Sequence, residues 1–268
     1  MDLTVPDYAY MFGFLQADGH LSGAPGRKGR LTAELSARDI GILRRFQELT
    51  PYPSSISERT RRTNFSDGHH SATWTVCSLA ARTRINELGL PYGKKSNRIK
   101  PPRVDFSRAD YLRGIVDADG SVGFTAAGLP FVSLTTESTA VVTYLCYYAH
   151  KVSGVLRIPR RNTRDGVYNV MFAVEHAQKL AAQLYYPGCL ALGRKREAAD
   201  SLAAWTRPEG MRAAHTRRVW SAREDRLLLL RLGDPAAAAT ELGRTRKSCT
   251  IRLWRLRRGE APMPAAEQ

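Results

Sequence analysis

Two aspartates, Asp18 and Asp119, stand 101 residues apart, and each follows an alanine and precedes a glycine at the end of an apolar stretch. In both stretches a glycine, Gly13 or Gly114, stands four residues before that alanine. Residues four apart share one helix face, so each stretch presents a face nearly free of side chains. Two such faces can pack at short range, and the expected interface is Gly13, Ala17, Gly114 and Ala118. Such packing would bring the two carboxylates side by side.

Two other interpretations of these stretches are simpler. Asp117, Asp119 and Ser121 could open a calcium loop, but that pattern requires glycine at its sixth position and glutamate at its twelfth. The chain has Val122 and Gly128 there. A single apolar stretch ending in Asp-Gly is most often a core helix followed by a turn. Its recurrence with matching downstream elements favours a duplicated unit.

The elements that must position the aspartates follow one order in each half. The first half predicts a strand at 31–36, a helix from 40 capped by Asp39, strands at 54–62 and 72–77 around a polar turn at Asp67-Gly68, and a helix at 80–88. The second half predicts strands at 121–125 and 131–135, a helix at 138–152, a hairpin of 155–160 with 167–174, and a helix at 175–185. Each half therefore reads as a helix followed by strand pairs and helices in alternation.

The charge of the chain indicates a polyanionic partner. Its 268 residues carry a formal net charge of +16, and 43% of them are hydrophobic, enough to fill a core. A basic surface gains affinity for phosphates by releasing counterions, although charge can also serve solubility alone. The four cysteines are scattered and form no Cys-x-x-Cys pair, which argues against a zinc ribbon or a disulfide framework.

The sequence shows no sign of a membrane partner. The N-terminus lacks a basic region followed by an apolar core, so no secretion signal is expected, and no apolar run approaches the length that spans a bilayer. We expect a cytoplasmic, nucleoid-associated protein if the chain is encoded by a bacterium or a phage.

Residues 112–120 resemble the nonapeptide motif of the LAGLIDADG homing endonuclease family, departing from it at Arg113 and Val116 apart from ordinary apolar exchanges. Residues 11–19 are a looser copy, with Gln16 where the family usually has an acid. The resemblance implies a single-chain, two-motif α+β protein with a pseudo-twofold duplicated αββαββα fold. In that fold the paired motif helices lie between two saddle-shaped antiparallel sheets.

The resemblance also implies the chemistry. The acid before the last glycine of each motif binds a divalent metal in the family, and this maps to Asp18 and Asp119, with the backbone carbonyls of Ala17 and Ala118 as further ligands. Mg²⁺ is the expected ion, and Mn²⁺ or Ca²⁺ could take the same site. Each aspartate would serve one strand of a long pseudo-palindromic DNA target, giving a double-strand break with short 3′ overhangs.

Two lysines recur at nearly the same interval as the aspartates. Lys95 follows the first unit in Gly93-Lys-Lys-Ser96, and Lys195 follows the second in Gly193-Arg-Lys-Arg196. The chain has only eight lysines against 33 arginines, so this match stands out. In the family a basic residue near each active site polarises the phosphate or the attacking water, and Lys95 and Lys195 are the candidates. Either lysine could instead contact a phosphate or only solvent.

Arginines gather around the predicted strands. An antiparallel sheet with one face covered by helices leaves the other face free, and such a face could read a major groove and contact phosphates. The alternative is a solvated basic face. The candidate DNA-binding residues of the sheets are Arg27, Lys28, Arg30, Arg59, Arg61 and Arg62 in the first half, and Arg157, Arg160, Arg161 and Arg164 in the second.

The composition changes beyond residue 210. Ser221 and Glu224 form a capping-box pattern that opens a helix, a second helix is predicted at 235–242, and a basic third helix at 244–258. Residues 217–258 resemble a Myb/SANT-type helix-turn-helix, which implies DNA contacts from Arg246, Lys247, Arg252 and Arg255. A purely structural tail is the alternative.

The expected division of the chain is a first repeat at 1–100, a second at 101–205, a linker at 206–216, a helix-turn-helix at 217–260 and a disordered tail at 261–268. The expected function is that of a monomeric, site-specific DNA endonuclease acting on double-stranded DNA. A non-cleaving DNA-binding regulator on the same fold is one alternative, against which the presence of both aspartates argues. An RNA maturase that assists intron splicing is another, and nothing in the sequence excludes it.

Overall fold

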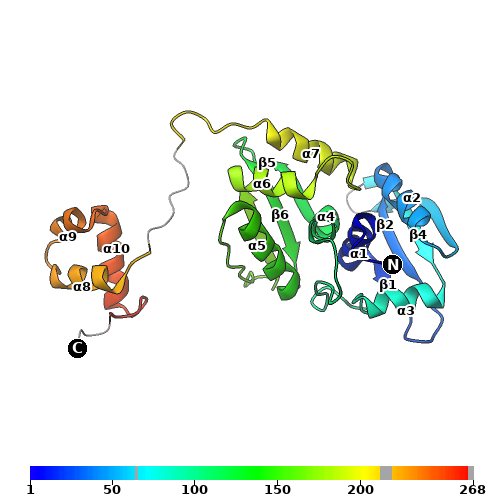
Figure 1. Ribbon diagram of the computed structural model, residues 1–268, viewed down its shortest axis with the longest axis horizontal. Helices are drawn as coiled ribbons and strands as arrows, with labels where there is room; N and C mark the ends of the chain where they lie inside the picture. The colour runs from blue at the N-terminus through cyan, green and yellow to red at the C-terminus, as the bar shows by residue number, and fades with distance from the viewer. Residues whose placement is uncertain (64–65, 212–218, 265–268) are drawn as a thin grey trace. The chain divides into compact units, whose positions relative to one another are not determined.

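The computed structural model describes residues 1–63, 66–211 and 219–264, and its chain divides into two units (Figure 1). The first unit is Met1–Arg207 and the second is Pro208–Gln268. In these described ranges no helix is long and apolar enough to cross a membrane. Each unit is considered separately.

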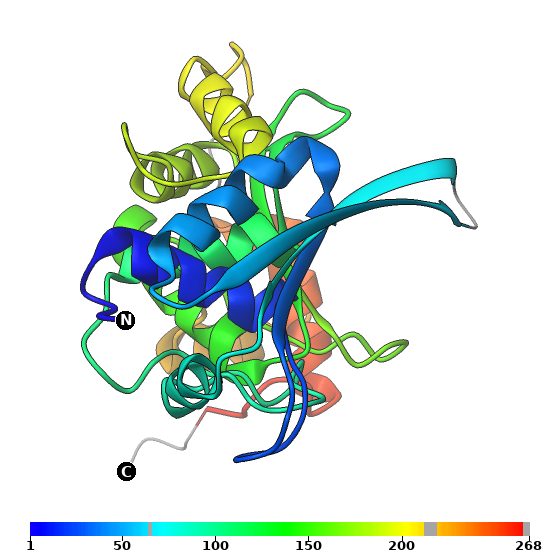
Figure 2. The same ribbon diagram turned by 90° about the vertical axis from the view of Figure 1, so that its right-hand side faces the viewer.

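The first half of the first unit builds a four-stranded antiparallel sheet and three helices. Its elements are α1 (Pro6–Asp18), β1 (His20–Leu21), β2 (Leu31–Ser36), α2 (Ile40–Leu49), β3 (Ser54–Thr63), β4 (Ser66–Val76) and α3 (Leu79–Glu87), with strand order β1-β2-β4-β3. Phe46 of α2 packs edge-on against Trp74 of β4, with ring centroids 6.0 Å apart, and both side chains are fully buried. The long hairpin of β3 and β4 curves away from the helices (Figure 2).

The second half repeats this order with one strand fewer. Its elements are α4 (Arg108–Asp119), β5 (Gly120–Phe124), β6 (Pro130–Thr136), α5 (Thr139–Ser153), β7 (Tyr168–Ala173), α6 (Glu175–Leu184) and α7 (Gly193–Ala203), with strand order β5-β6-β7. The burial of β6 alternates along the strand, so Val132 and Leu134 face the core and Ser133 faces away from it.

Helices α1 and α4 lie side by side between the two sheets (Figure 1). A β-carbon added to Gly13 would lie 2.2 Å from the backbone oxygen of Tyr111, and one added to Gly114 would lie 2.2 Å from that of Tyr10. Neither position has room for any side chain, because each glycine lies directly against the backbone of the other helix. The close approach of the two helices fixes their C-terminal ends next to each other.

Three local predictions were wrong. Residues 155–160 form no strand: Gly154 ends α5 in the left-handed conformation, and Pro159 has no N–H to give to a sheet, so a single bridge from Arg161 to Tyr168 is all that pairs there. The Asp67-Gly68 turn is absent because β4 already begins at Ser66.

The third wrong prediction concerns Asp39. This residue stands at the N-cap of α2, but its side chain makes no capping hydrogen bond, because a short 3-10 turn, Ala37–Asp39, precedes the helix. Its carboxylate lies 3.3 Å from Nε of Arg194 in α7 instead. Asp39 therefore joins the two halves of the first unit rather than starting a helix.

The second unit is a three-helix bundle formed by α8 (Ala222–Leu230), α9 (Pro235–Leu242) and α10 (Arg246–Arg257). The predicted capping box at Ser221 and Glu224 is present. Leu228, Ala238 and Cys249, one from each helix, are fully buried and form the centre of its core. Of the predicted disordered tail, residues 265–268 lie outside the described residues.

Candidate metal and nucleic-acid site

The two aspartates occupy equivalent helix ends. Asp18 is the last residue of α1 and Asp119 the last of α4, and both side chains remain open to solvent. The surrounding protein removes part of their hydration, and this burial, followed by the charge of Asp119, raises the pKa of Asp18 to about 6. Burial also raises the pKa of Asp119. The electrostatic effect of Asp119 on Asp18 indicates that the structure places these two predicted residues near each other.

Both predicted lysines reach the same helix ends. The ammonium group of Lys95 donates to the backbone oxygens of Gln16, at 2.7 Å, and of Ala17. Lys195 donates to the backbone oxygens of Val116, Asp117 and Gly120, each at 2.7 Å. The last carbonyls of a helix lack partners within it and carry the negative end of its dipole, so each lysine stabilises one helix end.

Burial disfavours the charged form of both lysines. Burial lowers the pKa of Lys195 to about 8, with the charge of Asp117 acting in the opposite direction. Burial likewise lowers the pKa of Lys95, and the charges of Asp119 and Asp18 partly offset it. Two carboxylates and two ammonium groups therefore share one partly dehydrated site, in which each charge depends on the others.

Two tyrosines that the sequence analysis did not single out join the helices across their interface. The hydroxyl of Tyr10 in α1 donates to Asp117 of α4 at 2.8 Å, and the hydroxyl of Tyr111 in α4 donates to Gln16 of α1 at 2.7 Å. Tyr10 and Tyr111 are also 101 residues apart, as are Gln16 and Asp117. The matched spacing was the signal that could have identified this pair.

Asp117, the other acid of the second motif, does not face solvent but accepts hydrogen bonds inside the protein. Asp117 is buried and also accepts from the hydroxyl of Tyr185 at 2.7 Å and from the backbone N–H of Leu192 at 2.8 Å. Burial raises its pKa, although these hydrogen bonds act to lower it. Gln16 fills the equivalent place without a charge, donating to the backbone oxygens of Gly89 and Lys100 at 3.0 Å each.

Arg113, where the second motif departs from the family pattern, is fully buried but satisfied. It forms an ion pair with Asp110 at 2.5 Å and donates to the backbone oxygens of Leu184 at 2.8 Å and Leu190 at 2.7 Å. Its guanidinium also lies 5.2 Å from the centre of the Tyr10 ring. The departure is accommodated by local partners and leaves the helix interface intact.

The donor set at the helix ends suits a hard cation. Within residues 1–63, 66–211 and 219–264, no three histidine, cysteine or acidic side chains gather closely enough to hold a metal by themselves. Asp18 and Asp119 supply two carboxylates, and the carbonyl groups of Ala17 and Ala118 directly precede them in the chain, that of Ala17 also accepting from Lys95. Mg²⁺ is commonly held by one or two carboxylates and completes its shell with water and substrate phosphates. The residues present therefore fit such an ion.

The outer face of the first sheet carries charge. Strand register places Glu34, Arg59 and Arg61 on the face opposite the buried Ala33 and Trp74. The carboxylate of Glu34 lies 2.8 Å from Arg59 and 3.3 Å from Arg61. Of the other candidates in this half, Arg27, Lys28, Arg30 and Arg62 are exposed, the first three in the segment between β1 and β2.

The outer face of the second sheet differs. The residues of β6 and β7 that point to this face are Ser133, Thr135, Asn169 and Met171, and none of the four is charged. The four candidate arginines of this half lie in the segment before β7 instead. Arg157 and Arg160 are exposed, and Arg164 is 3.2 Å from Asp165. Arg161 closes its own loop by donating to the backbone oxygen of Gly166 at 2.7 Å and stacking on Tyr168.

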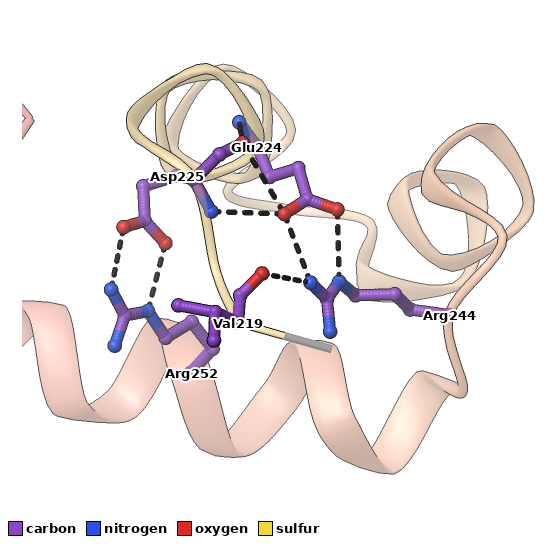
Figure 3. A network of polar contacts seen from close by, with 6 residues as sticks. Val219, Glu224, Asp225, Arg244 and Arg252 are labelled. Carbon is purple, nitrogen blue, oxygen red and sulfur yellow. Dashed lines mark hydrogen bonds and ion pairs between the residues drawn. The ribbon is translucent and has the colours of Figure 1, made fainter. Parts of the chain in front are cut away.

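Ion pairs occupy part of the basic surface of the second unit (Figure 3). Arg252 of α10 pairs with Asp225 of α8 at 2.6 Å, and Arg244 pairs with Glu224 at 2.9 Å while lying 4.0 Å from the centre of the Trp220 ring. These pairs give Arg252 a role in joining α8 to α10. Three other candidates, Arg246, Lys247 and Arg255, are exposed on α10.

Comparison with known proteins identifies the fold. No family model matches the sequence, and no curated protein matches it either. Among solved structures, the homing endonuclease I-WcaI bound to its DNA recognition sequence covers 73% of this chain and 88% of its own, with a TM-score of 0.50 and 13% identity. Variants of the homing endonuclease I-DmoI give the same TM-score and identity over 73% of this chain and 97% of theirs. The chain therefore has the LAGLIDADG homing endonuclease fold, as expected.

Proposed function

We propose that the chain is a site-specific DNA endonuclease that cuts both strands of a long pseudo-palindromic target with the help of Mg²⁺, and that it acts as a monomer. One observation carries the proposal: two solvent-open aspartates end the two packed helices, and each helix end also receives a lysine side chain. The net charge of +16 and the fold shared with a DNA-bound endonuclease support DNA as the partner.

The aspartates and the lysines of the site would have different roles in cleavage. Asp18 and Asp119, with the carbonyls of Ala17 and Ala118, would hold the divalent ion, which when bound neutralises charge on the attacking and leaving oxygens. Water adds across the phosphodiester: its oxygen bonds to phosphorus, the bond to the leaving sugar oxygen breaks, and that oxygen takes up a proton. Lys95 and Lys195 keep positive charge beside the reacting phosphates. Each aspartate serves one strand.

The sheets would bind the DNA on either side of the cut. Arg59 and Arg61 are exposed on the outer face of the first sheet and can reach base edges or phosphates, while the ion pairs of both with Glu34 limit how they turn. Because the two sheets differ in sequence and charge, the two half-sites are expected to differ, which makes the target an imperfect palindrome.

The second unit would add a further DNA contact through α10. Residues 207–258 contain fourteen basic and five acidic residues, so this stretch holds more than half of the net charge. Arg246, Lys247 and Arg255 are exposed on one helix that starts at a capped turn, the geometry with which a recognition helix enters a major groove. The Myb/SANT resemblance is consistent with this arrangement.

Removing the second unit tests that contact. A chain ending after Arg207 keeps the ion pair of Arg207 with Glu175 and the hydrogen bond from Gln178 to the Trp205 carbonyl, so the first unit remains complete. We expect the same cut position with weaker binding and a flatter salt dependence, because fewer phosphates are neutralised. An unchanged footprint and salt slope would show that the second unit does not bind DNA.

The proposed activity is tested by incubating the purified protein and Mg²⁺ with a library of duplexes and sequencing the ends that form. Asp18→Asn and Asp119→Asn should abolish double-strand cutting while sparing binding, because each removes a metal ligand but little of the contact surface. Asp105→Asn, at an exposed aspartate outside the site, is the control and should cut normally. Full cutting by Asp119→Asn would refute the site. Selective binding without any cut would instead favour a regulator.

A further inference from the structure

Arg82 of α3 is a buried cation without an acidic partner in the part of the chain that the structure describes. The residue is only 2% exposed, and arginine is rarely so buried unless it is paired. Its Nη2 donates to the backbone oxygen of Arg27 at 2.8 Å, and its Nε to that of Cys77 at 3.5 Å. Its Nη1 is buried with no hydrogen-bond partner among the described residues. Such burial costs free energy, and costs of this kind are found most often where function requires them.

The segment that Arg82 holds is the basic hairpin, residues 22–30 between β1 and β2. The pairing of these strands continues into it, because the N–H of Ser22 donates to the backbone oxygen of Arg30 at 2.8 Å and the N–H of Arg30 donates to Oγ of Ser22 at 3.0 Å. A β-carbon added to Gly29 would lie 2.3 Å from the backbone oxygen of Ser22 and 3.0 Å from Nη1 of Arg82. The basic hairpin is therefore packed both against its own base and against the guanidinium.

The basic hairpin carries three exposed cations, Arg27, Lys28 and Arg30, and no acid. Their side chains make no ion pair or hydrogen bond with the described residues, so each can bind a phosphate oxygen. The backbone oxygen that Arg82 binds belongs to the first of them. Cations on an ordered backbone lose less conformational entropy on binding than cations on a flexible loop.

Among the described residues of the second half, nothing corresponds to this arrangement. The turn between β5 and β6, residues 125–129, reads Thr-Ala-Ala-Gly-Leu and carries no charge. Gln178 stands at the fourth position of α6, as Arg82 does in α3. Its amide donates instead to the backbone oxygens of Leu202 and Trp205, at 2.8 Å and 2.7 Å. A phosphate contact from such a turn is therefore expected on one half-site only.

We propose that Arg82 is a positioning residue for DNA binding: it orders the basic hairpin, so that the three cations meet the phosphates of one half-site without a further loss of backbone freedom. The inference rests on the proposed endonuclease function and deepens it. Arg82 itself does not touch DNA, because it is buried. The half-site beside the first sheet is thereby bound more firmly than the other.

Arg82→Met tests the proposal, because methionine replaces the apolar stem of the arginine but none of its donors. Binding is measured on the duplex that the cleavage library identifies, without a divalent ion so that neither strand is cut. The variant should bind about tenfold more weakly, and its phosphate protection should shorten at one end of the site. Its melting temperature should fall little, since replacing a buried charge by an apolar side chain is often neutral.

Arg84→Met is the matched control. It removes the same charge from an exposed position of α3 and should leave both the affinity and the phosphate protection unchanged. A melting temperature that falls by several degrees in Arg82→Met, with binding as tight as that of the wild-type protein, would mean that Arg82 supports the fold alone and would overturn the proposal.

A double-mutant cycle separates positioning from other effects of Arg82. Replacing Arg27, Lys28 and Arg30 together by alanine should weaken binding and reduce the slope of its salt dependence by about three units, one for each phosphate no longer neutralised. In that background Arg82→Met should have no further effect, because the cations that it orders are gone. The same tenfold loss in both backgrounds would show that Arg82 acts elsewhere.

Two further measurements decide the point if Arg82→Met does not fold. Gly29→Ala would push the basic hairpin away from Arg82 and Ser22 without a change of charge, and it should weaken binding to the same extent at a nearly unchanged melting temperature. In the free wild-type protein the amide protons of Ser22 and Arg30 should exchange slowly with solvent. Rapid exchange of both would refute the anchoring.

The failures of the two proposals are distinguishable. If no duplex of the library is cut, the endonuclease function itself is wrong. If the wild-type protein cuts its target while Arg82→Met and Gly29→Ala bind that target as tightly as the wild-type protein does, the function stands and only the positioning role of Arg82 is refuted.

Discussion

In the first unit the two halves match closely at the interface of α1 and α4, but not in their sheets. Across the interface the halves match residue by residue: Gly13 faces Tyr111 as Gly114 faces Tyr10, and each tyrosine donates to a polar side chain of the other helix. The sheets do not match. One has four strands and a charged outer face, and the other has three strands and an uncharged one.

This difference follows from what each region must fit. The two helices are in backbone contact, so a substitution on one helix displaces the other. The same residue types, a glycine and a tyrosine, therefore occur at equivalent positions of both helices. The outer faces carry exposed side chains such as Arg59 and Met171, so their residues can suit an external partner. In this molecule the packed interface of α1 and α4 is therefore symmetric, and the outer faces of the two sheets are not.

The most severe way to break the symmetric region is to fill its glycine contact. Gly114→Val would place side-chain atoms within the backbone of Tyr10 and Phe14 and should prevent folding, a loss of roughly 5 kcal/mol or more. Gly41→Ala is the matched control, because Gly41 lies exposed in α2 with open space around it, and this change should stabilise by about 0.5–1 kcal/mol. Urea denaturation measures both. A folded, stable Gly114→Val protein would contradict the helix contact.

The crossing hydrogen bonds sharpen the comparison, because only one of them ends on a carboxyl group. Tyr10→Phe should cost about 2 kcal/mol, since its acceptor is the buried Asp117, and Tyr111→Phe about 1 kcal/mol, since its acceptor is the amide of Gln16. Chemical denaturation of the two variants gives the difference directly. Equal losses would mean that the two sides of the interface are energetically alike.

The sheets can be compared by binding. Arg59→Ala should weaken DNA binding roughly tenfold and reduce the slope of its salt dependence by about one unit if the side chain neutralises a phosphate. Ser133→Ala, on the outer face of the other sheet, should leave the slope unchanged because it removes no charge. Titrations of labelled duplex at several salt concentrations measure both. A flat response to Arg59→Ala would move recognition away from this face.

The smallest expected effect concerns Asp18 and pH. Its pKa in the folded chain, about 6, lies above the ordinary value of 3.8, so ionisation opposes folding as the pH rises through this window. Asp18→Asn should therefore stabilise the metal-free protein at about pH 7.5, by roughly 1 kcal/mol once solvent exposure is allowed for, and should have no effect near pH 4 or below. Asp105→Asn should be neutral at both. Stabilisation that persists at low pH would point to a cause other than charge.

Much of the fold could be predicted from the sequence. The apolar stretches, their glycines and the capping residues Ser221 and Glu224 are local signals, and the helices they predict are present. Residues 155–160 misled because apolar residues interspersed with arginines also occur in a loop, and Pro159 removes a donor that a strand needs. The site residues Asp18, Asp119, Lys95 and Lys195 remain predictions whose geometry is now described.

Most of the contacts that the sequence did not predict join residues far apart in the chain. The tyrosine contacts span 107 and 95 residues, and the ion pair that occupies Arg252 spans 27. The periodicity of apolar residues predicts on which face of a helix a side chain lies, but not which residue it contacts there. Charge near the predicted strands points Arg161 to DNA, and the Myb/SANT resemblance points Arg252 there, but each also has a structural partner within its own unit.

The crossing hydrogen bonds also determine how the first unit comes apart. Each half supplies the acceptor for a buried donor of the other. Unfolding one half would therefore leave a hydroxyl, an amide or a carboxyl group of the other half without its hydrogen-bond partner. Partial opening at this interface is thereby penalised from both sides. Met1–Arg207 should melt in a single transition, with the amide protons of α1 and α4 exchanging only through global unfolding and at the same rate.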